Sequence, residues 1–252
     1  MRHARLLILL LASLVVAGCY EVEPKISETV SETWPAAEIR TLELEGLNGT
    51  INVSSGPADQ IRMDADIRAN RPAKQLLEMS VADGVLRIHE KHQRRRGFPF
   101  SFMRTSSTRV DYEIVVPESL ELDLQTTNGR ILTQGVRGEQ KLGSVNGRIE
   151  VSTPNAKVVA VTVNGRIIAE FTEEFRGARL KTVNGSVRVA VPPDSAISAD
   201  VDMVNGSFKS ELPVVVDGNR RVSRGNGGPE YPLDVTTVNG SVSLSEIQPP
   251  AQ

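Results

Sequence analysis

The feature that most constrains the fold of this chain is a repeated Asn-Gly dipeptide. Copies with an apolar residue three positions after the Asn begin at Asn48, Asn128, Asn146, Asn164, Asn184, Asn205 and Asn239. From Asn128 to Asn205 the successive spacings are 18, 18, 20 and 21 residues, and the flanks are as alike as TVNGRI and TVNGSV. Near-identical segments at near-constant spacing indicate structural repeats that bury the same side chains in every copy.

Asn and Gly both tolerate positive φ, so each copy is expected to join two short strands at a sharp corner. The predicted structural turns are Asn128, Gly129, Asn146, Gly147, Asn164, Gly165, Asn184, Gly185, Asn205, Gly206, Asn239 and Gly240. Two arrangements fit this pattern. One is a right-handed parallel β-solenoid, or β-helix-like repeat, with one coil per copy and the Asn side chains in a ladder. The other is an antiparallel meander or sandwich. Equivalent positions share an environment only in the solenoid, which we therefore favour.

The rest of the chain also indicates an all-β protein. Period-two segments bounded by Gly, Pro or Asn recur, and no sustained helical period follows the leader. Only 4% of residues are aromatic against 39% hydrophobic, which predicts an aliphatic core. We expect a signal peptide over 1–18, a tether over 19–37, an irregular N-terminal β portion over 38–117 with a basic and aromatic loop at 89–104, and the repeat solenoid over 118–248.

The N-terminus carries a leader. Basic residues precede an apolar run, Leu6 to Val16, that is too short to span a bilayer as a helix. The run ends in Val16-Ala17-Gly18-Cys19, which resembles the lipobox of bacterial lipoproteins. That resemblance implies cleavage before Cys19, the only cysteine of the chain, and its acylation. Membrane lipid would then be a partner through acylated Cys19, and the location a bacterial cell envelope. Tyr20 after the cysteine favours the outer membrane or periplasmic face if the cell is Gram-negative.

Candidate catalytic chemistry is sparse. The mature chain would hold two histidines, His89 and His92, so neither a metal nor another cofactor is expected. No G-x-S-x-G motif is present. Carboxylates two residues apart could cleave a glycosidic bond, but an outward strand face is polar in any case. These pairs are Asp64/Asp66, Glu121/Asp123 and Asp200/Asp202. We predict a chain without catalytic residues and keep a polysaccharide-acting enzyme on a β-helical scaffold as the alternative.

One segment stands out by charge. Residues 89–104, HEKHQRRRGFPFSFMR, contain Arg94, Arg95 and Arg96 together with three phenylalanines. Basic side chains near apolar ones suit an anionic envelope polymer or a protein partner. The alternation of Phe98, Phe100 and Phe102 suits instead a strand that caps the solenoid. The formal net charge of −2 gives no electrostatic case for nucleic acid as a partner.

The order of these motifs resembles a known family. The segments are VDYEIVVP at 110–117, LELDL at 120–124 and the T-x-N-G-[RS]-[IV] copies through Val242. They are similar to the bacterial cell-envelope proteins of β-strand repeats called putative adhesins, a domain of unknown function. The resemblance implies a non-enzymatic lipoprotein whose repeat module is structural, adhesive or ligand-sensing, and it brings no catalytic residues.

Overall fold

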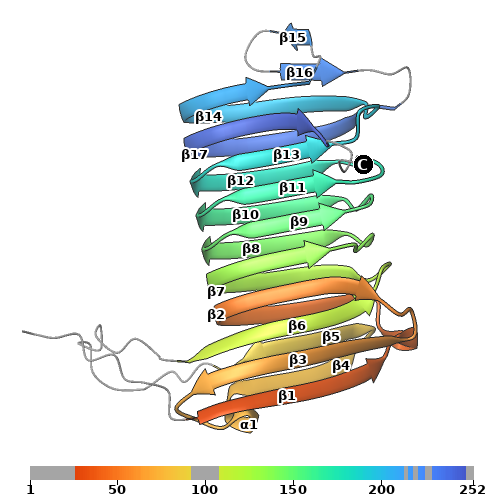
Figure 1. Ribbon diagram of the computed structural model, residues 1–252, viewed down its shortest axis with the longest axis vertical. Helices are drawn as coiled ribbons and strands as arrows, with labels where there is room; N and C mark the ends of the chain where they lie inside the picture. Colours follow the sequence, from red (N-terminus) through yellow and green to blue (C-terminus); the bar gives the residue numbers. More distant parts are fainter. Residues whose placement is uncertain (1–25, 92–107, 213–214, 218–220, 225–228, 248–252) are drawn as a thin grey trace, which may run out of the picture.

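The computed structural model describes residues 26–91, 108–212, 215–217, 221–224 and 229–247, which form a tall stack of strands (Figure 1). Two short helical turns, η1 (Ala36–Glu38) and α1 (Ala73–Leu76), lie near its lower end. The strands are β1 (Ile26–Pro35), β2 (Thr41–Gly56), β3 (Gln60–Ala69), β4 (Leu77–Ala82), β5 (Val85–Glu90), β6 (Arg109–Pro117), β7 (Glu121–Gln134), β8 (Gln140–Asn146), β9 (Ile149–Thr153), β10 (Val158–Asn164), β11 (Ile167–Phe171), β12 (Ala178–Asn184), β13 (Val187–Val191), β14 (Ile197–Ser210), β15 (Val215–Asp217), β16 (Arg221–Arg224) and β17 (Tyr231–Glu246).

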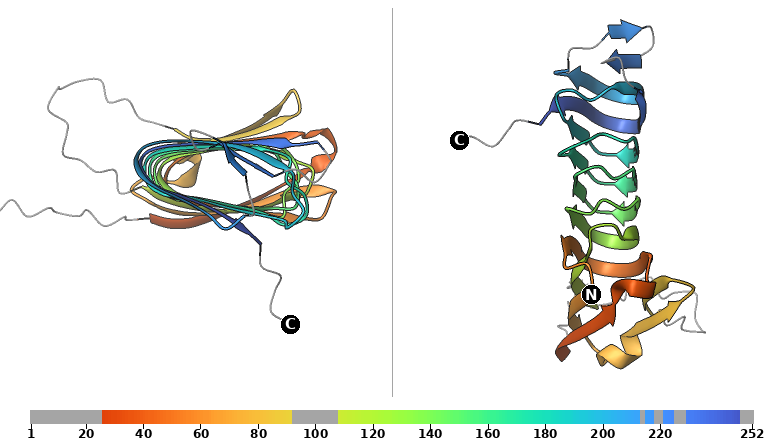
Figure 2. Two further views of the ribbon diagram at one scale, coloured as in Figure 1. Left: turned by 90° about the horizontal axis from the view of Figure 1, so that it is seen from above. Right: turned by 90° about the vertical axis from the view of Figure 1, so that its right-hand side faces the viewer.

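Each Asn-Gly copy forms one coil of a solenoid-like stack. In three coils a strand enters the Asn-Gly corner (β8, β10 or β12) and a second leaves it (β9, β11 or β13). In β2, β7, β14 and β17 one strand passes through the corner. Neighbouring coils pair in parallel, with Asn opposite Asn. The all-β repeat prediction is therefore confirmed, and the antiparallel alternative is wrong for the repeats. Seen from above, the coil is a flattened oval (Figure 2).

The core is the interior of this oval. Alternate residues of each strand point inward, as in β7, where Leu122, Leu124 and Ile131 are buried. Burying one such side chain stabilises the fold by roughly 1.5–3 kcal/mol. Equivalent positions of adjacent coils carry similar aliphatic side chains, so the interior is a set of Val, Leu, Ile and Ala columns. Phe171 and Phe175 add one edge-to-face contact, with ring centroids 4.9 Å apart.

The coils do not stack in the order of the chain. From the bottom the order is β2, β7, β8 with β9, β10 with β11, β12 with β13, then β17, then β14. After β13 the chain therefore skips one level, forms β14 at the top, and returns through β15 and β16. Its last strand, β17, then pairs with β13 below and β14 above.

The base below β2 is built differently. β5 and β6 pair in parallel with the two halves of β2 and so make one further coil. The outer strands are antiparallel, because β4 pairs with β5, β3 with β6 and β1 with β3. β1 lies inside the segment 19–37 that was expected to be a tether, and β2 joins the stack although it belongs to the expected N-terminal portion.

The polar composition of β1 explains why it resembles a tether. Only its residues Ile26, Val30 and Trp34 are even partly buried. Its hydroxyl groups instead bind the neighbouring strand, since Thr29 donates to Asp66 at 2.7 Å and Ser31 to Asp64 at 2.6 Å. An edge strand of this kind is held by its backbone ladder and by polar side chains rather than by a hydrophobic face.

Candidate functional site

The Asn side chains form a hydrogen-bonded ladder along one edge of the stack. In six links the amide Nδ2 of one Asn donates to the Oδ1 of a neighbour at 2.8–3.1 Å: Asn128 to Asn48, Asn146 to Asn128, Asn164 to Asn146, Asn184 to Asn164, Asn239 to Asn184 and Asn205 to Asn239. At the lower end Asn48 donates to the carbonyl oxygen of Thr108 at 3.1 Å. Every Asn is exposed or half-buried, so the ladder is a polar edge that solvent reaches.

Close stacking requires the glycine of each corner. A Cβ atom added at Gly165 would lie 1.7 Å from the carbonyl oxygen of Gly147, and one at Gly185 1.7 Å from that of Gly165. The sequence argument from positive φ holds for Gly49 (φ 129°) and Gly206 (φ 157°). It is wrong for Gly165 and Gly185, whose φ is outside that region. The glycines there are needed because backbone approaches backbone, not because the chain turns left-handed.

A second column lines the inside of the same corner. Thr162, Thr182 and Thr237 are buried, and each donates its hydroxyl to the carbonyl oxygen of a corner glycine one coil below, at 3.2–3.4 Å. Ser144 occupies the same column, since it pairs with Thr162 in register. Its buried Oγ has no hydrogen-bond partner. The column is therefore regular except at this coil.

Outside the corner, two residues after each Asn, polar donors stack in register. From bottom to top this donor column consists of Thr50, Arg130, Arg148, Arg166, Ser186, Ser241 and Ser207. Arg130 and Arg148 both reach the same oxygen of Glu150, at 2.7 and 3.0 Å. Partial burial opposes ionisation of Glu150, but these two arginines outweigh it and lower its pKa. Sequence reasoning missed the column, although the Arg of three successive NGR copies was visible.

Before the corner, the residue preceding each Asn makes an apolar stripe. The valine column consists of Val145, Val163, Val183, Val238 and Val204 in stack order. These side chains are between 36% and 72% exposed, so the valine column is surface rather than core. The ladder edge thus carries three parallel strips: valines, amides and donors.

The lower end of the interior column carries a buried carboxyl group. Glu90 is only 5% exposed and lies below Gly46, the one coil position where a threonine would leave no room for it. Its Oε1 accepts the backbone N–H of Leu47 at 3.1 Å and the hydroxyl of Tyr112 at 3.4 Å. Burial outweighs both hydrogen bonds and raises the pKa of Glu90 to about 7.

The acid pairs of the sequence analysis do not meet at one place. Asp64 and Asp66 bind β1, and the Ser31 hydrogen bond is the main reason that the pKa of Asp64 is lowered. Glu121 accepts from Thr41 at 3.2 Å and Asp123 from Gln125 at 3.2 Å. Asp200 and Asp202 lie on the top coil. His89 faces Glu78 at 3.4 Å. Each group serves its own strand.

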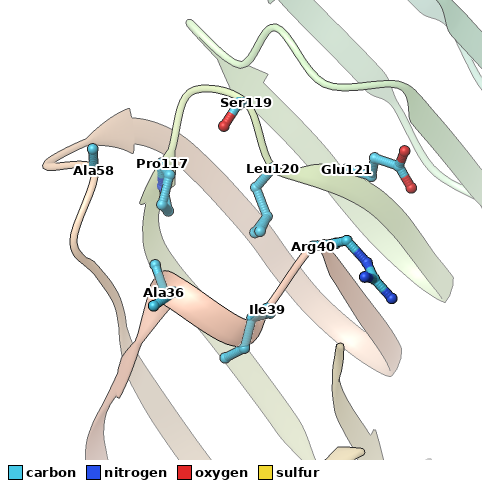
Figure 3. Close-up of a pocket in the computed structure, with 9 residues that line it drawn as sticks. Ala36, Ile39, Arg40, Ala58, Pro117, Ser119, Leu120 and Glu121 are labelled. Atoms are coloured by element: carbon cyan, nitrogen blue, oxygen red, sulfur yellow. The ribbon is translucent and has the colours of Figure 1, made fainter. Parts of the chain in front are cut away.

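A shallow cavity of about 330 Å³ lies at the corner opposite the ladder. Figure 3 shows Ala36, Ile39 and Leu120 between η1 and the turn before β7, with Arg40 and Glu121 to one side. Arg40 reaches the carbonyl oxygen of Asp83 at 3.3 Å. The apolar floor suits a small apolar group, and no convergent set of titratable side chains lines it.

Several predicted sites lie outside the described residues: the leader with Cys19, and Arg94, Arg95 and Arg96 with the neighbouring phenylalanines. Within the described ranges, no three His, Cys, Asp or Glu side chains gather as metal ligands. Over the same ranges no helix has the length and apolar character needed to cross a membrane.

Comparison with known proteins gives a family and a fold. The family described as Toastrack DUF4097 matches residues 28–245. A crystal structure of a "putative cell adhesion protein" from Clostridium sporogenes is similar, with a TM-score of 0.55, 10% identity, and 88% of this chain and 100% of that chain covered. A "putative lipid binding protein" from Parabacteroides distasonis aligns with a TM-score of 0.33 and 11% identity over 87% and 97% of the two chains. Comparison with curated proteins finds no match.

Proposed function

The chain belongs to the Toastrack DUF4097 family, and from that premise we propose that it is a non-enzymatic binding module of the bacterial cell envelope. Its rigid solenoid displays repeated side chains to an extended partner, as an adhesive or ligand-sensing protein does. The observation that carries the proposal is the ladder edge, where three exposed strips run side by side over successive coils. The name of the Clostridium sporogenes neighbour, a cell adhesion protein, agrees with this role.

In this proposal acylated Cys19 holds the module on a membrane, as the lipobox resemblance implies. Seven residues separate Cys19 from the start of β1 at Ile26, a reach of at most about 25 Å. The base would therefore lie near the lipid and the top coil away from it. We take the coil to be right-handed, the sense that connections between parallel strands nearly always adopt.

The proposal also gives a role to Arg94, Arg95 and Arg96. β5 ends at Glu90 and β6 begins at Arg109, so these arginines belong to the connection at the lower end of the ladder. There they would contribute to binding an anionic envelope polymer.

Metabolic labelling with an alkynyl fatty acid tests the anchor. The wild type should take up the label and remain with the membrane fraction, whereas Cys19→Ala should take up none and appear as soluble or unprocessed chain. Unlabelled wild type would disprove lipidation. The binding role is tested separately, by retention of the Cys19→Ala chain on immobilised anionic polysaccharide; no retention at low ionic strength would contradict it.

A further inference from the structure

The donor column is the most regular charged feature of the surface. Its seven members follow one line beside the Asn ladder, and adjacent coils are about 4.8 Å apart. Three guanidinium groups occupy its lower half and three serine hydroxyls its upper half. We propose that the donor column binds a linear anionic polysaccharide lying along the axis of the stack. This inference rests on the proposed function and names its partner class.

The arginines have donors to spare. A guanidinium group carries five N–H donors. Glu150 accepts one contact from Arg130 and one from Arg148, and Arg166 gives its Nε–H to the hydroxyl of Ser186 at 3.0 Å. These contacts hold the planar groups in place, and the other N–H groups of each arginine face outward. Planar groups fixed in this way suit carboxylate, sulfate or phosphate substituents of a chain.

The neighbouring columns fit a sugar polymer. On one side the Asn amides offer donors and acceptors of the kind that bind sugar hydroxyls. On the other side the next column contains half-buried Leu132 and Ile168, which present a low aliphatic surface between the arginine levels. A chain with alternating anionic and hydroxyl groups therefore meets a complementary partner at each coil.

A linear partner fits better than a planar one. The sheet face that carries the donor column also carries Glu113 below it and Glu170 and Glu211 farther from the corner. An anionic lipid surface laid on this face would meet those carboxylates. A single polymer chain that follows the column meets Thr50, the arginines and the serines, and avoids them.

The test uses the full chain with Cys19→Ala and immobilised polygalacturonate, a linear polymer with regularly spaced carboxylates. Replacing Arg130, Arg148 and Arg166 by Ser, the residue that continues the column above, should weaken binding about a hundredfold at low ionic strength. The matched control replaces Arg137, Lys157 and Arg176 by Ser at the opposite corner, where the change in net charge is the same. The control should bind like the parent. Arg166→Ser alone should weaken binding about fivefold, and it leaves the two Glu150 ion pairs intact.

Several outcomes would overturn the inference. Equal loss in the column and control variants would show an unspecific charge effect. Unchanged binding of both column variants would show that the arginines are not used. Loss of polymer binding on replacement of Arg94, Arg95 and Arg96 alone, with the column variants unaffected, would leave the proposed function intact and place the partner elsewhere. Column-dependent retention on phosphatidylglycerol vesicles without retention on polygalacturonate would replace the polymer by a lipid surface.

Discussion

The repeat stack and the base solve one problem, closing a coil at its corner, in different ways. In the stack from β7 upward, each coil turns through an Asn-Gly pair, hydrogen bonds its Asn to the next and buries a hydroxyl residue beside the corner. In the base, the coil made by β5 and β6 lacks that pair. Its chain leaves the corner after β5 and returns at β6, and the buried position belongs to Glu90.

The difference shows how uniformity distributes stability. A stack of equivalent corners contributes many similar increments, none of them dependent on pH in the ordinary range. The base concentrates its corner in one carboxyl group, one tyrosine hydroxyl and one backbone N–H. The stack should therefore respond to steric change and the base to protonation.

The largest expected effect breaks a corner of the stack. Gly165→Val would place Cβ where the Gly147 carbonyl oxygen already lies, so two coils must separate. We expect a loss of at least about 3 kcal/mol in the free energy of unfolding, measured from denaturant midpoints. The same substitution at Gly143 is the control, because a Cβ there makes only an ordinary 3.6 Å contact with Gln125. Asn164→Ala, which removes two exposed hydrogen bonds, should cost about 1 kcal/mol. If Gly165→Val is as stable as Gly143→Val, the close-approach argument is wrong.

The next effect separates the base by pH. Burial raises the pKa of Glu90 from 4.5 to about 7, so the folded chain holds this proton more tightly than the unfolded chain. The resulting stability is fully present below about pH 4.5 and is lost as the pH rises through 7, by about 3 kcal/mol in all. Unfolding curves between pH 4 and 8 should show this slope for the wild type relative to Glu90→Gln, whose amide oxygen can still accept from Leu47.

Glu150→Gln in the stack provides the opposite sign. Arg130 and Arg148 lower the pKa of Glu150, so its contribution is present above the usual glutamate range and is lost as the pH falls through the lowered value. A wild type and Glu90→Gln pair with parallel pH profiles would remove the proposed contrast between base and stack.

The smallest effect makes the stack more uniform. Ser144→Thr should let the hydroxyl donate to the carbonyl of the coil below, as Thr162 does to Gly147, and should fix the side-chain rotamer. We expect a gain of about 0.5–1 kcal/mol in the free energy of unfolding. Thermal unfolding of Ser144→Thr and of the reverse change, Thr162→Ser, should move in opposite directions. A lower midpoint for Ser144→Thr would mean that the column has no space for the added methyl group at this coil.

Much of the stack could be predicted from its repeats, because spacing and flanks together fix which residues share an environment. The order of the last two coils could not. The flanks of Asn184, Asn205 and Asn239 are so alike that each fits above any other, and only the path of the intervening chain decides that Asn239 follows Asn184. β1 was hidden by its polar composition. Glu90 was hidden because its burial depends on the absent side chain of Gly46, a contact between strands far apart in sequence.

The donor column shows a different limit. Its arginines and serines are plain in the sequence, but whether they lie in one line depends on the register of strands that are themselves set by the Asn-Gly corners. Once the register is known, the side on which each residue lies follows from the period of two. Sequence reasoning that stops at the motif therefore finds the corner and misses the surface next to it.

The position of β17 gives the biosynthesis of this protein an unusual order. A chain made from its N-terminus can add coils upward only as far as β13, because the level above belongs to residues that are made last. β14 has to wait without its lower neighbour until β17 arrives between them. A ribosome that stops short of Tyr231 therefore releases a chain that lacks an inner storey, with its roof already made and nothing to rest on.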